Sequence, residues 1–169
     1  MGKLTGRTAV VAGGHSGFGE AISRLFAAEG ANVVIGARRR ELVDEVASSI
    51  GGVGVTCDIT DDAQVQALVA AATQAFGYIH IAVNRAGFEQ STSLADLTPD
   101  KLEAMHAVQL TGAIFCTRRF ANALAARGEG GGFCSISSLT AQNPARGLLA
   151  CASAKAGLES EGRALLPKS

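Results

Sequence analysis

The chain has 169 residues, of which 47% are hydrophobic and 18% are charged, and this composition excludes a disordered protein. Fifteen basic and fifteen acidic residues cancel, which argues against a general surface for nucleic acid or membrane. No hydrophobic run reaches transmembrane length, and the first residues lack the apolar core of a signal peptide. We therefore expect one cytoplasmic domain over residues 1–169, without nucleic-acid or membrane partners.

The four cysteines lie far apart in the sequence, at Cys57, Cys116, Cys134 and Cys151. Their spacing is not that of metal ligands, so no metal site is expected. In a chain without a secretion signal, these residues are expected to be reduced thiols that mostly fill the core.

The segment from Val10 to Phe26 has the pattern strand, glycine-rich turn, helix, with the helix expected to open at Ala21. A diphosphate can approach a helix N-terminus only where backbone N–H groups are accessible, and a Cβ in the turn would hold it away. The spacing Gly13-x-x-x-Gly17-x-Gly19 differs from the commoner G-x-G-x-x-G, and a turn that only packs helix on strand is the alternative. Its position in the first strand–helix unit favours a dinucleotide site. The expected contact residues are Gly13, His15, Ser16, Gly17, Phe18 and Gly19.

Short hydrophobic runs alternate with helical patterns along the rest of the chain. Further strands are expected at residues 32–37, 53–57, 78–83 and 133–136. Helices are expected at about 40–50, from 61 or 62 onward, at about 99–127 with Thr98 as N-cap, and at about 150–166. Apolar strands between helices predict a parallel sheet covered on both faces, which is an α/β doubly wound, Rossmann-like fold of three layers (α/β/α). In this fold the strand order is 3-2-1-4-5, and the ligand lies at the carboxyl ends of the strands.

The residues after the second expected strand bear on the choice of nucleotide. In this fold a carboxylate there binds the ribose 2′-hydroxyl of NAD, whereas an arginine accommodates the 2′-phosphate of NADP. The sequence reads Arg38-Arg39-Arg40, and the first acid is Glu41. A guanidinium binds phosphate in a bidentate manner, so Arg38 predicts NADP(H) in preference to NAD(H), with His15 as a further donor nearby. Arg39 and Arg40 are expected to form a solvated helix start.

Further motifs follow the third, fourth and fifth expected strands. They are Asp58-Ile59, Asn84-Arg85-Ala86-Gly87, Ile136-Ser137-Ser138 and, in the last helix, Lys155. Together with the glycine turn, in this order and spacing, they make the chain resemble the short-chain dehydrogenase/reductase family from Leu4 to Leu166. The resemblance implies an oxidoreductase that moves hydride between a nicotinamide and a small carbonyl or alcohol substrate. It also implies that Asp58, with Ile59 beside it, meets the adenine, and that Asn84, Ala86 and Gly87 line the adenosine side.

The family's catalytic set is Asn, Ser, Tyr and Lys. By resemblance, Ser138 holds the substrate oxygen, and Lys155 grips the nicotinamide ribose and lowers the tyrosine pKa. The tyrosine position, four residues before the lysine, holds Cys151, and the asparagine position holds Gln109. The second asparagine of the usual Asn-Asn-Ala-Gly is replaced by Arg85. The alternatives are a turn-capping hydroxyl for Ser138 and a solvated helical lysine for Lys155.

Carbonyl reduction needs a proton delivered to the oxygen from hydrogen-bond distance. A tyrosine reaches that point with the far end of its ring, whereas the sulfur of Cys151 ends one bond beyond Cβ. The only tyrosine, Tyr78, is expected at the amino end of the sheet, away from the site. Loss of general-acid catalysis typically costs ~10²–10⁴ in rate, so low or no activity is expected. Cys151 is interpreted as a small packing residue, a poor surrogate acid, or a covalent or redox thiol.

Members of the family usually continue through two more strands and a substrate-covering helix. The resemblance therefore implies a carboxyl-terminally truncated fold that lacks its last strands, and the strand at 133–136 is expected to be an exposed edge. Association into a homo-oligomer is expected through the helices at 99–127 and 150–166, the usual pairing face of the family. Three functions stay open: a weak oxidoreductase, a non-catalytic NADP(H)-binding or interaction module (a pseudoenzyme), and a truncated relic that does not fold stably alone.

Overall fold

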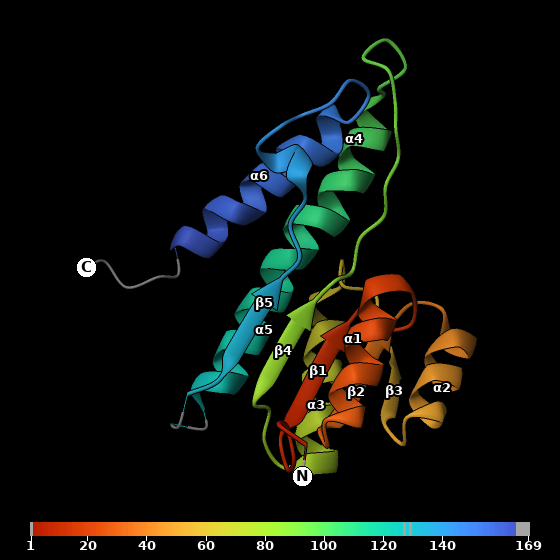
Figure 1. The fold of residues 1–169 in the computed structure, drawn as a ribbon. Coiled ribbons are helices and arrows are strands. Elements are labelled where there is room, and N and C mark those ends of the chain that lie inside the picture. Colours follow the sequence, from red (N-terminus) through yellow and green to blue (C-terminus); the bar gives the residue numbers. More distant parts are fainter. Residues whose placement is uncertain (1, 127, 129, 165–169) are drawn as a thin grey trace.

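Five strands form one parallel sheet in the computed structural model, which describes residues 2–126, 128 and 130–164 (Figure 1). They are β1 (Thr8–Ala12), β2 (Asn32–Ala37), β3 (Val53–Thr56), β4 (Ile81–Asn84) and β5 (Gly132–Ser135). The order across the sheet is β3-β2-β1-β4-β5, and every neighbouring pair is parallel, as the sequence predicts. The α/β doubly wound, Rossmann-like class is therefore confirmed.

Three strands differ from their expected bounds, and the first of them, β3, ends at Thr56, one residue before the expected end. Residues 78–80 precede β4 rather than opening it, because Gly77, at φ +81°, turns the chain and Tyr78 is left 61% exposed. The fifth strand lies one residue earlier than expected, since Ile136 follows its last residue, Ser135.

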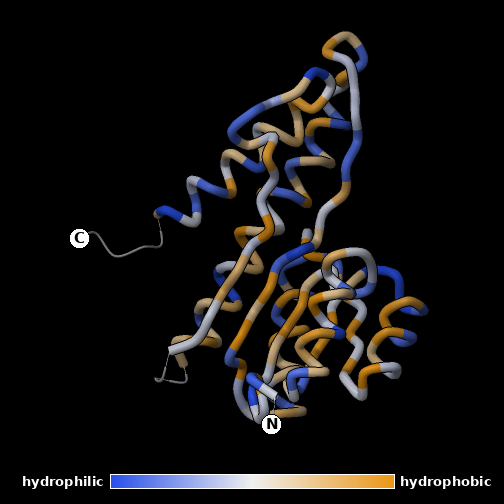
Figure 2. Tube along the Cα trace, in the orientation of Figure 1, coloured by the Kyte–Doolittle hydropathy of each residue, from blue (hydrophilic) through white to orange (hydrophobic). Residues whose placement is uncertain are grey.

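Helices cover both faces of the sheet, and the strands alternate their side chains between the two faces. On one face Val11, Val33 and Ile35 pack against α1 (Gly17–Ala28) and α2 (Arg40–Ser49). On the other face Val10, Val34 and Ala82 pack against α3 (Asp62–Phe76) and α5 (Ala113–Ala125). Because both faces are buried, the strands are continuous hydrophobic runs, which Figure 2 shows along β1, β2 and β4.

Side-chain caps begin two of the helices where the sequence predicts them. The Asp61 carboxylate accepts from the backbone N–H groups of Ala63 and Gln64 ahead of α3. The Thr98 hydroxyl accepts from the N–H of Lys101 at the start of α4 (Pro99–His106). The first helix instead begins at Gly17, four residues before the expected start, so two of the turn's glycines belong to its first turn.

The long helix expected at 99–127 consists of three segments, and residue 127 lies outside the described residues. Between α4 and α5 the helix widens into a π-helical turn, η1 (Ala107–Gly112). Gly112 lies against the loop after β3 here, where a Cβ would come 2.9 Å from the Ile59 carbonyl oxygen. A π turn inserts an extra residue, which changes the direction of the side chains within it, including Gln109.

The last helix, α6 (Leu149–Ala164), packs against α4, η1 and a 3-10 turn, η2 (Leu139–Ala141), that the sequence pattern did not indicate. Residues 165 and 166, its expected end, lie outside the described residues. Figure 1 shows α4, α6 and the loops between them above the carboxyl ends of the strands. Within residues 2–126, 128 and 130–164, no helix is both long and apolar enough to cross a bilayer.

Three of the four cysteines are buried, and Cys134 on β5 is exposed. Burial raises the pKa of the Cys57 thiol to about 12 and also raises the pKa of Cys116. Both thiols therefore stay protonated near neutral pH and pack as core residues.

Candidate functional site

The glycines of the turn after β1 have different physical roles. A Cβ at Gly13, whose φ is +81°, would lie 2.7 Å from the Ala86 nitrogen, and one at Gly19 would lie 2.1 Å from the Gly13 carbonyl oxygen. These two glycines allow close packing of the turn on the loop after β4 and on α1. Gly17 has φ +53°, and the space around its would-be Cβ is open. The turn therefore packs the helix on the sheet and leaves open space at Gly17, while its contact with a dinucleotide stays a prediction.

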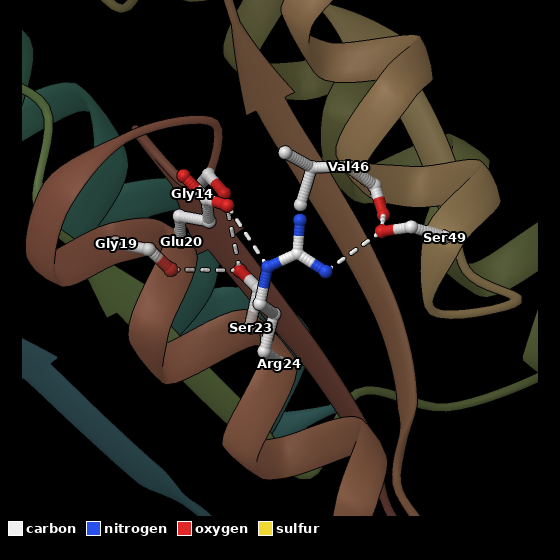
Figure 3. A network of polar contacts seen from close by, with 7 residues as sticks. All are labelled: Gly14, Gly19, Glu20, Ser23, Arg24, Val46 and Ser49. Carbon is white, nitrogen blue, oxygen red and sulfur yellow. Dashed lines mark hydrogen bonds and ion pairs between the residues drawn. The ribbon is translucent and has the colours of Figure 1, made fainter.

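A network of side chains holds this turn in place (Figure 3). The buried hydroxyl of Ser23 donates to the carbonyl oxygens of Gly19 at 2.8 Å and Gly14 at 3.4 Å. On the next residue, the Arg24 guanidinium pairs with Glu20 at 2.9 Å and donates to the Ser49 hydroxyl of α2 at 2.9 Å. Ser23 thus ties the glycine turn to its own helix, and Arg24 ties that helix to α2.

A cavity of about 260 Å³, which we call the nucleotide cavity, lies at the carboxyl ends of β1, β2, β3 and β4. Eight of the residues predicted to contact a cofactor line it: Gly13, His15, Ser16, Arg38, Asp58, Ile59, Ala86 and Gly87. Asn84 is buried beneath it, and its side-chain oxygen accepts from the Ala86 N–H at 3.2 Å. Gly17 and Gly19 lie behind it in the first turn of α1, whereas Phe18 and Lys155 line a second cavity.

Two consecutive arginines follow β2 beside the nucleotide cavity. Arg38 and Arg39 both line it, and Arg39 also donates to the His15 ring nitrogen Nε2 at 3.0 and 2.7 Å. Burial, and then the nearby charges of Arg39 and Arg38, lower the pKa of His15, so its ring is neutral near pH 7. Arg40 points away and forms an exposed ion pair with Asp44, as expected for a solvated helix start.

Arg39 is a lining residue that the sequence reasoning assigned only to a solvated helix start. The sequence feature that could have indicated this contact is the position of Arg39 directly after Arg38, at the N-cap of α2. The contact with His15 depends on how the glycine turn folds back over β2, which no local pattern encodes.

The second cavity, of about 360 Å³, lies beside the first and is called the catalytic cavity here because it holds all four residues of the altered set. Gln109 enters from η1, Ser138 from the loop after β5, and Cys151 and Lys155 from α6. The structure thus brings together residues that are up to 46 positions apart, from 109 to 155. Their chemical roles remain predictions.

Lys155 is buried, which contradicts the alternative of a solvated helical lysine. Its Nζ donates to the carbonyl oxygen of Ile136 at 2.8 Å, and burial lowers the pKa of its ammonium group. Ser138 has the capping role that was the alternative for it, because its hydroxyl accepts from the Thr140 N–H at 3.3 Å and from the Thr140 hydroxyl at 2.9 Å. Since Ser138 accepts in both contacts, its own proton is free to be donated into the cavity.

Cys151 is 7% exposed and packs with Met105 and Ala150 in a small hydrophobic cluster. Its sulfur also lies 3.7 Å from the Gln109 amide nitrogen and 3.8 Å from the Thr140 hydroxyl. The Gln109 amide nitrogen donates to the Phe88 carbonyl oxygen and to the Met105 sulfur, both at 2.6 Å, so the thiol is its most distant partner. These contacts agree with a small packing residue, and Thr140 is a neighbour that the sequence reasoning missed because η2 was not expected.

The comparisons with known proteins agree with this architecture. The sequence profile of the short chain dehydrogenase family matches residues 7–165. The chain is 32% identical to a short chain dehydrogenase/reductase of Aspergillus oryzae, over 92% of this chain and 62% of the relative. It is 35% identical to an NADP-dependent (R)-specific alcohol dehydrogenase of Lentilactobacillus kefiri, over 81% of this chain and 56% of the relative. A short-chain type dehydrogenase/reductase from Mycobacterium marinum superposes with a TM-score of 0.91 at 24% identity, over 96% of this chain and 66% of that structure.

The chain therefore belongs to the short-chain dehydrogenase/reductase family, a family of oxidoreductases that bind NAD(P) and act on small molecules. It spans about three-fifths of the length of the curated relatives described above. The likeness to the solved structure concerns the fold alone.

Proposed function

We propose that this chain binds NADP(H) in preference to NAD(H) and is an oxidoreductase of the family's type whose hydride transfer is impaired. The observation that supports this proposal is the contrast between the two cavities. The nucleotide cavity is lined by Gly13, Arg38 and Arg39, whereas the catalytic cavity has a buried thiol where the family resemblance places a phenol. A bound nicotinamide would supply the hydride. The protein would have to position the substrate, stabilise the charge that develops on its carbonyl oxygen, and donate a proton to that oxygen.

The residues of the nucleotide cavity fit a phosphorylated dinucleotide. The open space at Gly17 admits a diphosphate to the N-terminus of α1, whose backbone N–H groups and dipole favour an anion. Arg38 and Arg39 place two guanidinium groups at the end of β2, where a 2′-phosphate would lie. Repulsion among these cations is relieved when an anion binds, which favours the phosphorylated form of the dinucleotide.

The residues of the catalytic cavity can orient a carbonyl group but are poorly equipped to protonate it. Ser138 has a hydroxyl proton to donate to the substrate oxygen, and the buried ammonium of Lys155 supplies positive charge nearby. The Cys151 thiol is held against Gln109 and Thr140, short of the point that a phenol would reach. Because general-acid catalysis typically contributes ~10²–10⁴ in rate, we propose turnover reduced by about that factor.

Fluorescence titrations of NADPH and NADH with the purified chain test the nucleotide preference. Replacing Arg38 by alanine removes charge-assisted hydrogen bonds of ~1.5–3 kcal/mol, so the Kd for NADPH should rise by ~10- to 100-fold while that for NADH stays unchanged. The matched control is Arg40→Ala, which removes the same charge outside the cavity and should change neither Kd. Absence of saturable NADPH binding, or a preference for NADH, would overturn the proposal.

A non-catalytic NADP(H)-binding module is the second candidate, and the packing of Cys151 with Met105 and Ala150 favours it. In that case the protein binds NADPH as above, but replacing Cys151 by tyrosine produces no turnover of any ketone. We also propose, as further parts of this account, that residues 1–169 form one cytoplasmic domain and that copies associate through α4, α5 and α6.

A further inference from the structure

Arg85 lies at the junction of the two cavities and lines both of them. It follows the last residue of β4, and its backbone N–H donates to the carbonyl oxygen of Ala12 at 2.8 Å. Its carbonyl carbon and the Ala86 nitrogen lie close against Gly13, where a Cβ would meet them at 2.9 and 2.7 Å. The backbone of Arg85 is therefore fixed beside the glycine turn, and its side chain is placed between the nucleotide end and the catalytic end.

The guanidinium of Arg85 has no hydrogen bond or ion pair with any residue in the described part of the chain. Three other cations line the two cavities, Arg38, Arg39 and Lys155, and the charge of Arg85 adds to burial in lowering the pKa of Lys155. Two carboxylates line the cavities: Asp58, which is engaged by the N–H and hydroxyl of Thr60, and the exposed Glu89. A half-buried cation among other cations is unfavourable until an anion joins it.

We propose that Arg85 binds an oxyanion, a phosphate or a carboxylate, at the junction of the nucleotide and catalytic cavities. This inference rests on the proposed function, because the oxyanion would belong either to the diphosphate of the dinucleotide or to an acidic carbonyl substrate. The planar guanidinium offers paired N–H donors that match either group in a bidentate manner. Where the family resemblance places a neutral asparagine, this chain has a cation between its two cavities, which selects for negative charge.

The test compares wild type with Arg85→Ala and Arg85→Lys in two titrations. The first measures the Kd of NADPH and of NADH. The second measures, on protein saturated with NADPH, the Kd of benzoylformate and of acetophenone, which share a phenyl ketone but differ by a carboxylate. Arg40→Ala is the control for loss of one positive charge outside the cavities, and thermal unfolding of each variant establishes that it is folded.

If Arg85 binds the diphosphate, the alanine variant weakens NADPH and NADH equally, by ~10-fold or more. If it binds an acidic substrate, both dinucleotides bind as in wild type, but the preference for benzoylformate over acetophenone is lost. The lysine variant should retain part of either effect, since it keeps the charge without the bidentate geometry. A folded alanine variant that matches wild type in every titration overturns the inference. Wild type that binds neither dinucleotide overturns the proposed function instead, and benzoylformate binding to the free protein then still tests Arg85.

Discussion

The two cavities of this protein are adjacent, yet they are built from different parts of the chain. The nucleotide cavity depends mainly on backbone, since Gly13 and Gly19 could not gain a side chain without moving the chain around them. The catalytic cavity depends on the ends of single side chains, such as those at positions 109 and 151. Backbone geometry that the fold itself requires is hard to lose, whereas a side-chain end can be exchanged with little effect on the fold.

The environment of Cys151 illustrates the second case. Met105 and Ala150 pack around the short side chain, and Gln109 fills part of the space with its own contacts to Phe88 and Met105. The fold is thus satisfied without a phenol. A comparable exchange at Gly19 would push a methyl group into the carbonyl oxygen of Gly13.

The largest expected effect comes from restoring a phenol to the catalytic cavity. Replacing Cys151 by tyrosine should increase ketone-dependent oxidation of NADPH by ~10²–10⁴, because a proton donor then reaches the carbonyl oxygen. The cavity of about 360 Å³ beside Cys151 has room for the ring. Steady-state absorbance at saturating NADPH measures the rate, and an unchanged thermal unfolding temperature shows that the ring is accommodated. A variant that is folded, binds NADPH and reduces no ketone would favour the non-catalytic module.

The second largest effect concerns the glycine turn beside the nucleotide cavity. Replacing Gly19 by alanine forces the turn to shift, at a cost of ~1–3 kcal/mol in folding free energy, and should abolish most NADPH binding. Chemical denaturation and fluorescence titration measure the two consequences. The control is Gly162→Ala in α6, where a Cβ would meet open space; this change should stabilise the helix by ~0.5–1 kcal/mol and leave binding intact. Equal behaviour of the two variants would show that the turn is not constrained as described.

A smaller effect should appear in the pH dependence of stability at Lys155. Because burial lowers its pKa below the ordinary 10.5, the unfolded chain binds this proton more tightly than the folded chain does. Stability should therefore rise as the pH increases from the folded pKa of Lys155 toward 10.5, and Lys155→Met should lack this increment. Urea denaturation of both proteins across that range measures the difference, with the exposed Lys3→Met as control. If the Lys155 variant keeps the full increment, the lysine is not desolvated.

The smallest effect is expected at Asp62, which lines neither cavity and whose carboxylate pairs with Arg118 and Arg119 of α5. Hydrogen bonds from Arg119 and Arg118 lower the pKa of Asp62 from 3.8 to about 2. The pair therefore stabilises the fold above pH 3.8, and its contribution is lost as the pH falls toward 2. Asp62→Asn should slightly reduce thermal stability above pH 3.8 and should lessen the loss of stability between pH 3.8 and 2. The control is Asp44→Asn, which breaks an exposed ion pair with Arg40 and should change neither the stability nor its dependence on pH.

The order of the strands and the place of the site could be predicted because they follow from local patterns. Hydrophobic runs such as Asn32–Ala37 alternate with capped helices, and parallel strands present their following loops at one edge of the sheet. The π turn at Ala107–Gly112 could not be predicted, since it depends on how Gly112 packs against Ile59, which is distant in sequence. The contact of Arg39 with His15 likewise depends on two loops meeting in space.

The junction residue Arg85 shows the same limit. The sequence marks it as a departure from the family pattern, but only the fold reveals that its side chain lies between the two cavities. The function of a long side chain in a loop depends on the groups around it, and tertiary structure determines which groups those are.

The central claim is that this chain binds NADP(H) while lacking the group that completes carbonyl reduction. One measurement tests it most directly: NADPH binding and ketone-dependent NADPH oxidation followed on the same preparation of the unaltered protein. The account predicts saturable NADPH binding with turnover at the limit of detection. Rapid reduction of a ketone with cysteine at position 151 would contradict it, because the proton would then have to come from a residue that has been assigned another role.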